Sequence, residues 1–75
     1  MLAQVAVDNR GLEPPEPMVR ILAAVNTLAA EDRVVALMDR EPLLLYPELE
    51  RRGCEWSLED AGDHYVLQVW RMADT

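Results

Sequence analysis

The sequence predicts an α+β domain, a two-layer sandwich in which two helices cover one face of a four-stranded mixed sheet. Three observations support this prediction. Short apolar runs alternate with helix-like runs, charged turns that contain proline separate them, and two strand-like runs close the chain. The element order is therefore βαβαββ within a single domain of residues 1–75, because so short a chain forms one core.

The first strand is expected from Leu2 to Val7, a short apolar run that is rich in valine and alanine. A helix is expected from Met18 to Leu28, because apolar side chains recur there at helical spacing and form one face. Pro15 or Pro17 suits the first helical turn, where the missing N–H is not needed. The apolar face consists of Met18, Ile21, Leu22, Val25 and Leu28.

The second strand is expected from Arg33 to Met38, and its apolar side chains on both faces predict a place inside the sheet. A charged turn, 39–42, and a run of leucines then lead into the second helix. Pro47 falls in the first turn of that helix, where proline is tolerated. Gly53 is expected to follow the helix as a C-terminal cap.

The last two strands form a predicted hairpin. The third strand, Cys54 to Glu59, alternates between apolar and polar residues, and the fourth runs from His64 to Trp70. A four-residue turn between them would pair Glu59 with His64. The side expected to face the helices carries Cys54, Trp56, Leu58, Tyr65, Leu67 and Val69.

The predicted strand order is 1-2-4-3. Both crossover connections should be right-handed, and the fourth strand must form a hairpin with the third. The fourth strand is apolar on both faces and fits the interior. The third strand, which carries a row of glutamates, makes a protected edge.

The net charge of −7, with 14 acidic residues against 7 basic ones, argues against nucleic acid and anionic membranes as partners. No apolar run approaches the roughly 20 residues of a membrane-spanning helix, and no signal-peptide pattern opens the chain. A single cysteine fits a reducing compartment, so we expect a cytoplasmic protein. The use of arginine without lysine is associated with GC-rich bacterial genomes.

The sequence lacks the residue sets that most catalytic and metal sites require. Cys54 is the only cysteine and His64 the only histidine, so neither a disulfide nor a zinc site is expected. No Ser-His-Asp arrangement or phosphate-binding glycine loop is present. We therefore expect no metal, no cofactor, no catalytic residue and no enzymatic activity.

A candidate ligand or partner site lies in the two turns that follow the first and second strands. Parallel strands bring these turns to one edge of the sheet, where α/β domains commonly bind ligands. Arg10 and Arg40 could bind a small anion or an acidic peptide there. Alternatively, they pair with nearby glutamates as a solvated ion-pair network. The candidate residues are Arg10, Glu13, Pro14, Pro15, Glu16, Arg40 and Glu41.

Four further residues each allow two interpretations. Cys54 is a reactive thiol or a small buried hydrophobic residue. His64 is a ligand or general base, or a cross-strand partner of Glu59. Val66 and Trp70 on the uncovered sheet face form an interface or are scattered surface residues. With the apolar edge of the first strand, they predict a possible homodimer.

The stretch from Asp8 to Pro17 resembles the TusA/SirA-like group of small bacterial proteins. Sulfur carriers of that group have Arg-Gly-Leu-x-Cys-Pro-x-Pro between the first strand and the first helix. Pro14 stands where those carriers have cysteine, and proline offers no thiolate for a persulfide. The matching residues are Arg10, Gly11, Leu12, Pro15 and Pro17 in this stretch and Pro47 at the second helix.

A closer resemblance is to an uncharacterised branch of that superfamily, a domain of unknown function, through residues 39–44 and 46–50. Relatives in this branch carry a histidine in each turn and occur beside hemerythrin-like or nitrogen-oxide-related proteins. Glu16 and Arg40 stand at the histidine positions, so any metal pair is missing here. The resemblance implies a non-enzymatic interaction or accessory domain with a protein partner. The alternatives are a small-ligand or redox-linked accessory domain using Arg10 and Arg40, and a divergent thiol carrier using Cys54.

Overall fold

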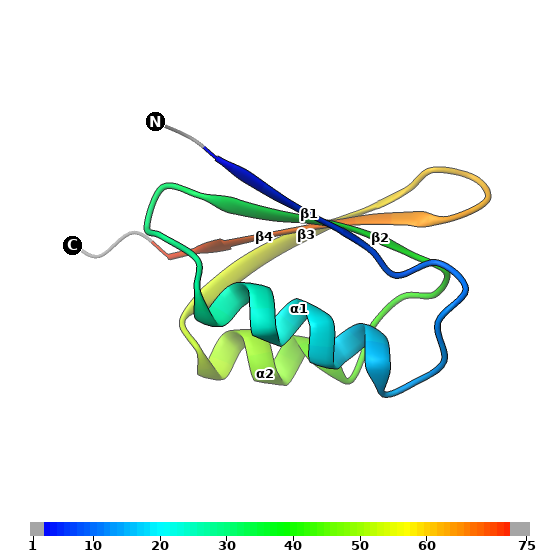
Figure 1. Ribbon diagram of the computed structural model, residues 1–75, viewed down its shortest axis with the longest axis horizontal. Helices are drawn as coiled ribbons and strands as arrows, with labels where there is room; N and C mark the ends of the chain where they lie inside the picture. The colour runs from blue at the N-terminus through cyan, green and yellow to red at the C-terminus, as the bar shows by residue number, and fades with distance from the viewer. Residues whose placement is uncertain (1–2, 73–75) are drawn as a thin grey trace.

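A computed structural model describes residues 3–72, so the expected strand start at Leu2 lies outside the described residues. The elements follow the predicted βαβαββ order, and Figure 1 shows both helices on the same face of the sheet. They are β1 (Gln4–Asp8), α1 (Glu16–Asn26), β2 (Arg33–Met38), α2 (Leu45–Arg51), β3 (Cys54–Asp60) and β4 (Tyr65–Arg71).

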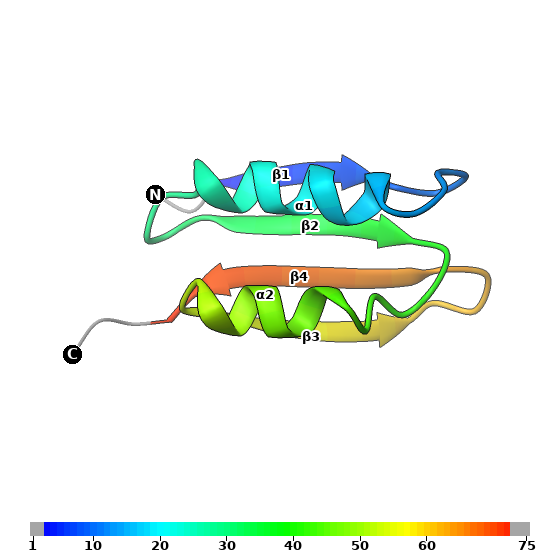
Figure 2. The same ribbon diagram turned by 90° about the horizontal axis from the view of Figure 1, so that it is seen from below.

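The sheet has the predicted strand order β1-β2-β4-β3. β1 pairs with β2 in parallel, and β4 runs antiparallel to both β2 and β3. The carboxyl ends of β1, β2 and β3 therefore lie together, as Figure 2 shows. We call this the loop end of the molecule: residues 8–16, 39–44 and 60–64, which hold both βα turns and the hairpin.

The core lies between the sheet and the two helices. Alternate residues of β2 point into it, and α1 and α2 bury one face each, as the periodicity predicted. Met18 and Leu22 are only partly buried. The buried apolar residues are Val7, Ile21, Val25, Leu28, Val34, Ala36, Met38, Leu45, Leu49, Cys54, Leu67 and Val69.

The boundaries of α1 lie two residues before the predicted ones at each end. The helix begins at Glu16, directly after Pro15, and Pro17 lies in its first turn, where it replaces an N–H that needs no partner. It ends at Asn26, and Leu28 is buried although it lies beyond the helix. At the end of α2, Gly53 adopts a φ of 70° and donates its N–H to the Glu50 carbonyl at 3.0 Å, which confirms the predicted cap.

The predicted hairpin register was wrong by two positions. Glu59 lies opposite Val66 rather than His64, and Asp60 pairs with Tyr65, so the turn is 61–64. The carboxylate of Asp60 accepts the N–H of Gly62 at 2.9 Å, which lets β3 continue one residue further than expected. A shift of two residues keeps every side chain on its own face, so the predicted inward set is confirmed.

Candidate functional site

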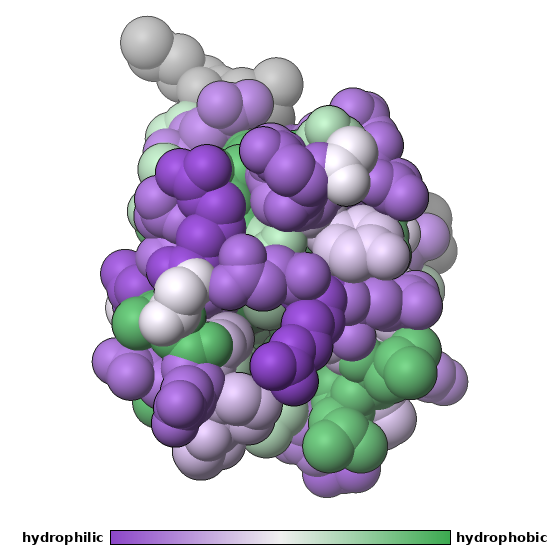
Figure 3. All heavy atoms as spheres, turned by 90° about the vertical axis from the view of Figure 1, so that its right-hand side faces the viewer, coloured by the Kyte–Doolittle hydropathy of each residue, from purple (hydrophilic) through white to green (hydrophobic). Residues whose placement is uncertain are grey.

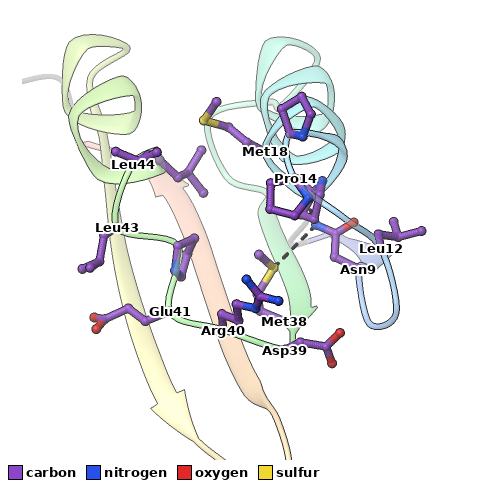
Figure 4. A pocket seen from close by; sticks show the side chains of 14 residues that line it. Asn9, Leu12, Pro14, Met18, Met38, Asp39, Arg40, Glu41, Leu43 and Leu44 are labelled. Atoms are coloured by element: carbon purple, nitrogen blue, oxygen red, sulfur yellow. Dashed lines mark hydrogen bonds between the residues drawn. The ribbon is translucent and has the colours of Figure 1, made fainter.

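A pocket of about 290 Å³ opens at the loop end, between the β1–α1 turn and the β2–α2 turn. Most of its wall is apolar, and proline, leucine and methionine dominate it. Figure 4 shows Met18 of α1 and Leu44 of the β2–α2 turn on facing sides. The lining residues are Asn9, Leu12, Pro14, Pro15, Pro17, Met18, Met38, Asp39, Arg40, Glu41, Pro42, Leu43, Leu44 and Leu45.

Asn9 holds the β1–α1 side of the pocket in place. Its backbone N–H donates to Leu37 at 2.9 Å, which extends the pairing of β1 with β2 by one bond. Its side-chain Nδ2 donates to the carbonyl of Pro17 at 2.9 Å and lies 3.5 Å from the Met38 sulfur. Only 1% of Asn9 is exposed, and its Oδ1 is buried without a hydrogen-bond partner in the described chain.

The two turns are joined by a hydrogen bond between Gly11 and Asp39. The N–H of Gly11 donates to Asp39 Oδ2 at 2.6 Å. Gly11 has a φ of 79°, a conformation that glycine adopts without steric cost. The peptide bond between Pro14 and Pro15 is cis, and both prolines form part of the pocket wall. The β1–α1 turn is therefore tied both to β2 and to the turn opposite.

The β2–α2 turn presents apolar side chains to solvent at the rim of the pocket. Leu43 is 64% exposed and Leu44 83% exposed, while the next residue, Leu45, is buried in the core. Figure 3 faces the loop end and shows hydrophobic groups breaking a mainly hydrophilic surface in its lower half, where the helices lie. An exposed apolar surface beside a pocket is a feature of interaction sites.

Tyr46, the second residue of α2, is bonded to this turn. Its hydroxyl donates to Glu41 Oε2 at 3.2 Å, and its ring stacks on Trp56 with centroids 4.9 Å apart and planes 9° from parallel. Burial, followed by the hydrogen bond and charge of Glu41, raises the pKa of Tyr46 to about 12. Tyr46 is therefore a neutral hydrogen-bond donor at physiological pH, and it orients Glu41.

Four of the candidate residues named from the sequence line the pocket and three do not. Pro14, Pro15, Arg40 and Glu41 line it. Arg10, Glu13 and Glu16 are not among its lining residues. Arg10 and Glu13 lie in the β1–α1 turn, and Glu16 is the first residue of α1.

Arg10 pairs with Asp8 rather than with a glutamate. Its Nη2 lies 3.0 Å from Asp8 Oδ2, and its Nε donates to Asp8 Oδ1 at 3.0 Å. Hydrogen bonds from Arg10 lower the pKa of Asp8 to about 2. Arg40 makes no hydrogen bond or ion pair with residues 3–72. The expected network of Arg10 and Arg40 with Glu13, Glu16 and Glu41 is therefore not formed.

Sequence reasoning missed the apolar character of this site. The predicted site consists of charged residues and two prolines of the turns, and leucines 43–45 are expected only to lead into α2. One signal was available, because a helix start can direct only one of three consecutive leucines into the core. Met18 and Met38 could not have been found in this way, since both follow the periodicity of core residues and also line the pocket.

The remaining candidates lie away from the pocket. Cys54 is 2% exposed, and burial raises the pKa of its thiol. The ring Nδ1 of His64 lies 2.5 Å from Asp63 Oδ1, so the predicted pairing of His64 with Glu59 was wrong. The open sheet face carries Val66 and Trp70, and both are half-buried. The guanidinium of Arg33 covers Trp70, 4.4 Å from its ring centroid.

Residues 3–72 contain no group of three or more histidine, cysteine, aspartate or glutamate side chains placed to hold a metal ion. Neither α1 nor α2 combines the length and the hydropathy that crossing a membrane requires.

Comparison with known proteins identifies one family. The model of the family described as "Uncharacterized conserved protein (DUF2249)" matches residues 6–71. No curated protein and no solved structure matches the chain. The matched residues run from within β1 to the last residue of β4, so they include both helices, all three connections of the loop end and the pocket between them. The chain therefore belongs to the DUF2249 family.

Proposed function

We propose that this protein is a small non-enzymatic interaction module that holds an apolar side chain of a protein partner in the loop-end pocket. The pocket is the observation that carries this proposal. Its volume of about 290 Å³ is at the lower limit of small-molecule sites, which typically span roughly 300–1,000 Å³. One or two side chains would fill it.

The exposed leucines support a protein partner. Leu43 and Leu44 extend the apolar surface from the pocket onto the rim, although α2 takes its core contacts from Leu45 and Leu49. The fold therefore gains little from them in the free protein. Interfaces commonly bury one anchor side chain in a pocket and surround it with apolar contacts that exclude water. This arrangement fits such an interface.

The polar groups at the pocket support a binding role rather than a catalytic one. The amide of Asn9, the carboxylate of Asp39 and the carboxylate of Glu41 each hold a structural hydrogen bond. Cys54 and His64, the side chains most suited to covalent or acid–base chemistry, lie outside the pocket lining. What remains is an apolar recess with one unpaired guanidinium, that of Arg40.

We also propose that the domain is TusA-like and acts in the cytoplasm. The turn residues Arg10, Gly11 and Leu12 and the prolines after them support the resemblance, together with the βαβαββ order. Pro14, at the position of the carrier cysteine, forms part of the pocket wall. On this proposal, the turn that holds a thiol in sulfur carriers forms an apolar binding surface here.

A second candidate function is a small-ligand accessory domain, and Arg40 favours it. Arg40 lines the pocket without an ion pair in the described chain, so it could bind an anionic group of a small ligand. Arg10 cannot share this role without breaking its pair with Asp8. The third candidate is a thiol carrier that uses Cys54. Burial argues against it, because burial raises the pKa of the thiol and so disfavours the reactive thiolate.

The proposed function can be tested by capturing partners from the native host with the purified protein as bait. The double variant Leu43→Ser/Leu44→Ser removes the apolar rim. Both leucines are exposed, and α2 takes its core contacts from Leu45 and Leu49, so α2 should be preserved. Val19→Ser is the matched control, because Val19 is 57% exposed on α1 but does not line the pocket.

We expect a partner that binds the wild-type protein and Val19→Ser in stoichiometric amounts and is lost with the double variant. Direct binding of the purified partner should reproduce this difference. A partner that the double variant retains at full affinity would show that the pocket is not the binding site, and the proposal would then be wrong.

A further inference from the structure

We infer that the partner segment bound at the loop-end pocket is a basic peptide, with one apolar anchor side chain flanked by lysine or arginine. This inference rests on the proposed function and names the chemistry of the partner. It is carried by the excess of carboxylates at the loop end and by the lack of ion-pair partners for Glu13 and Glu16 among the described residues.

The rim of the pocket is acidic. Asp39 and Glu41 line it, and Figure 4 shows their carboxylates on opposite sides. In the sequence, Glu13 and Glu16 flank Pro14 and Pro15, which form part of the wall. Arg40 is the one basic residue among the lining residues, so the lining holds two carboxylates against one guanidinium, and Glu13 and Glu16 add two more in the adjoining β1–α1 connection.

The same imbalance extends over the whole loop end. Its three segments contain seven carboxylates and two arginines, and the rest of the chain contains seven carboxylates and five arginines. Asp8 already neutralises Arg10. Most of the net charge of −7 therefore lies at the end of the molecule that carries the pocket. The acidic residues are Asp8, Glu13, Glu16, Asp39, Glu41, Asp60 and Asp63.

Glu13 and Glu16 are unpaired in the free protein. Their side chains make no hydrogen bond or ion pair with residues 3–72, whereas Glu48 binds both Arg51 and Arg52. The α1 dipole favours Glu16 in the first helical turn, but it gives no reason for Glu13. Unpaired carboxylates on one surface repel each other, and a cationic partner relieves that repulsion.

The distribution of these groups favours a peptide over a small amine. The pocket accommodates one anchor, but Leu43 and Leu44 lie at its rim and the carboxylates come from both turns. Only an extended ligand reaches the anchor pocket, the leucines and the acidic groups together. The guanidinium of Arg40 can donate hydrogen bonds to backbone carbonyls of such a segment.

The test begins with a random 12-residue peptide display library, selected on immobilised wild-type protein and in parallel on the variant Leu43→Ser/Leu44→Ser. We expect the wild-type selection to enrich peptides that combine one aromatic or large aliphatic residue with two or more lysines or arginines. The parallel selection should not enrich them, because the rim that covers the anchor has been removed.

The best enriched peptide and a counterpart with glutamine at each basic position are then synthesised and labelled. Fluorescence anisotropy at low and high salt then measures the affinity of both peptides for the wild-type protein and for the variant Glu13→Gln/Glu16→Gln. The control variant is Glu50→Gln/Glu55→Gln, which makes the same charge change outside the loop end. We expect roughly five-fold weaker binding for the first variant at low salt and little change for the control. High salt should remove most of that difference.

Each outcome separates the inference from the proposed function. Neutral or acidic peptides whose binding depends on Leu43 and Leu44 would support the pocket as a binding site and overturn the basic partner. Basic peptides that bind the wild type and Leu43→Ser/Leu44→Ser equally would show non-specific attraction and would also overturn it. Selection of no pocket-dependent peptide would contradict the proposed function itself.

Discussion

The Nη2 atom of Arg71 donates a hydrogen bond of 2.9 Å to the backbone carbonyl of Val25, so the end of β4 caps the end of α1. The Nε atom of Arg71 donates to the carbonyl of Leu28, also at 2.9 Å. The last turn of α1 contains no basic residue of its own. A guanidinium 46 positions away in the chain therefore supplies the charge that the negative end of the helix dipole favours.

We predict that Arg71→Met lowers the free energy of unfolding by about 2 kcal/mol, because two hydrogen bonds from a charged, partly buried donor are lost. Urea unfolding followed by circular dichroism measures this. Arg51→Met is the matched control, since its pair with Glu48 is exposed and should contribute roughly 0–1 kcal/mol. Equal effects of the two substitutions would show that Arg71 is not a cap.

We predict that Asn9→Asp, which introduces a charge, lowers the free energy of unfolding more than Asn9→Ala, which removes the amide. Asn9→Ala removes the bond to Pro17 but also the unpaired Oδ1, so we expect a loss of about 1–2 kcal/mol. Asn9→Asp replaces the donor with a buried carboxylate that faces a carbonyl, and the loss should be larger, about 3 kcal/mol near neutral pH. Protonation of that carboxyl relieves the penalty, so the gap between the variants should narrow as the pH falls. A gap that stays constant would contradict this reading of the site.

The pair of Asp8 with Arg10 predicts a specific pH dependence. The Asp8 pKa is lowered from 3.8 to about 2, so the stabilisation that the pair provides is present above pH 3.8 and disappears as the pH falls toward 2. The difference in stability between the wild type and Asp8→Asn should therefore shrink over that window. NMR titration of the Asp8 carboxyl checks the pKa directly, and Arg10→Met should return it toward its ordinary range.

Cys54 should be unreactive in the folded protein. Burial raises its pKa, so we expect reaction with a disulfide reagent at mildly alkaline pH to be roughly 100-fold slower than in urea. Incubation with a cysteine desulfurase and cysteine should leave no persulfide on the protein. A stable persulfide on Cys54 that passes to an acceptor would instead support a thiol carrier.

Self-association through the open sheet face or the free edge of β1 remains a prediction. Val66 and Trp70 provide apolar area there, although Arg33 covers part of Trp70, and the net charge of −7 opposes association. We expect a homodimer in sedimentation experiments at micromolar concentration and moderate salt, and Trp70→Ser should weaken it. A monomer that Trp70→Ser leaves unchanged would mean that this face is ordinary surface.

Much of the fold could be predicted from local patterns. The side-chain period of α1 indicated its buried face, and the apolar run of β2 indicated a central strand. Proline and glycine positions placed the start of α1 and the end of α2 within a few residues. The candidate site was only half predictable. The sequence indicated the two turns, but it did not indicate that their leucines and prolines enclose a pocket.

The sequence by itself determined the element order, the strand order and the face on which each inward side chain lies, because these follow from backbone periodicity and chain connectivity. The tertiary structure alone decided the hairpin register, the pairing of Arg10 with Asp8, the cap from Arg71 to Val25 and the pocket. Each of these depends on distances between groups that periodicity does not encode. The observed register is accompanied by one hydrogen bond from Gly62 to Asp60, and the pocket lies where parallel pairing of β1 with β2 brings their turns together.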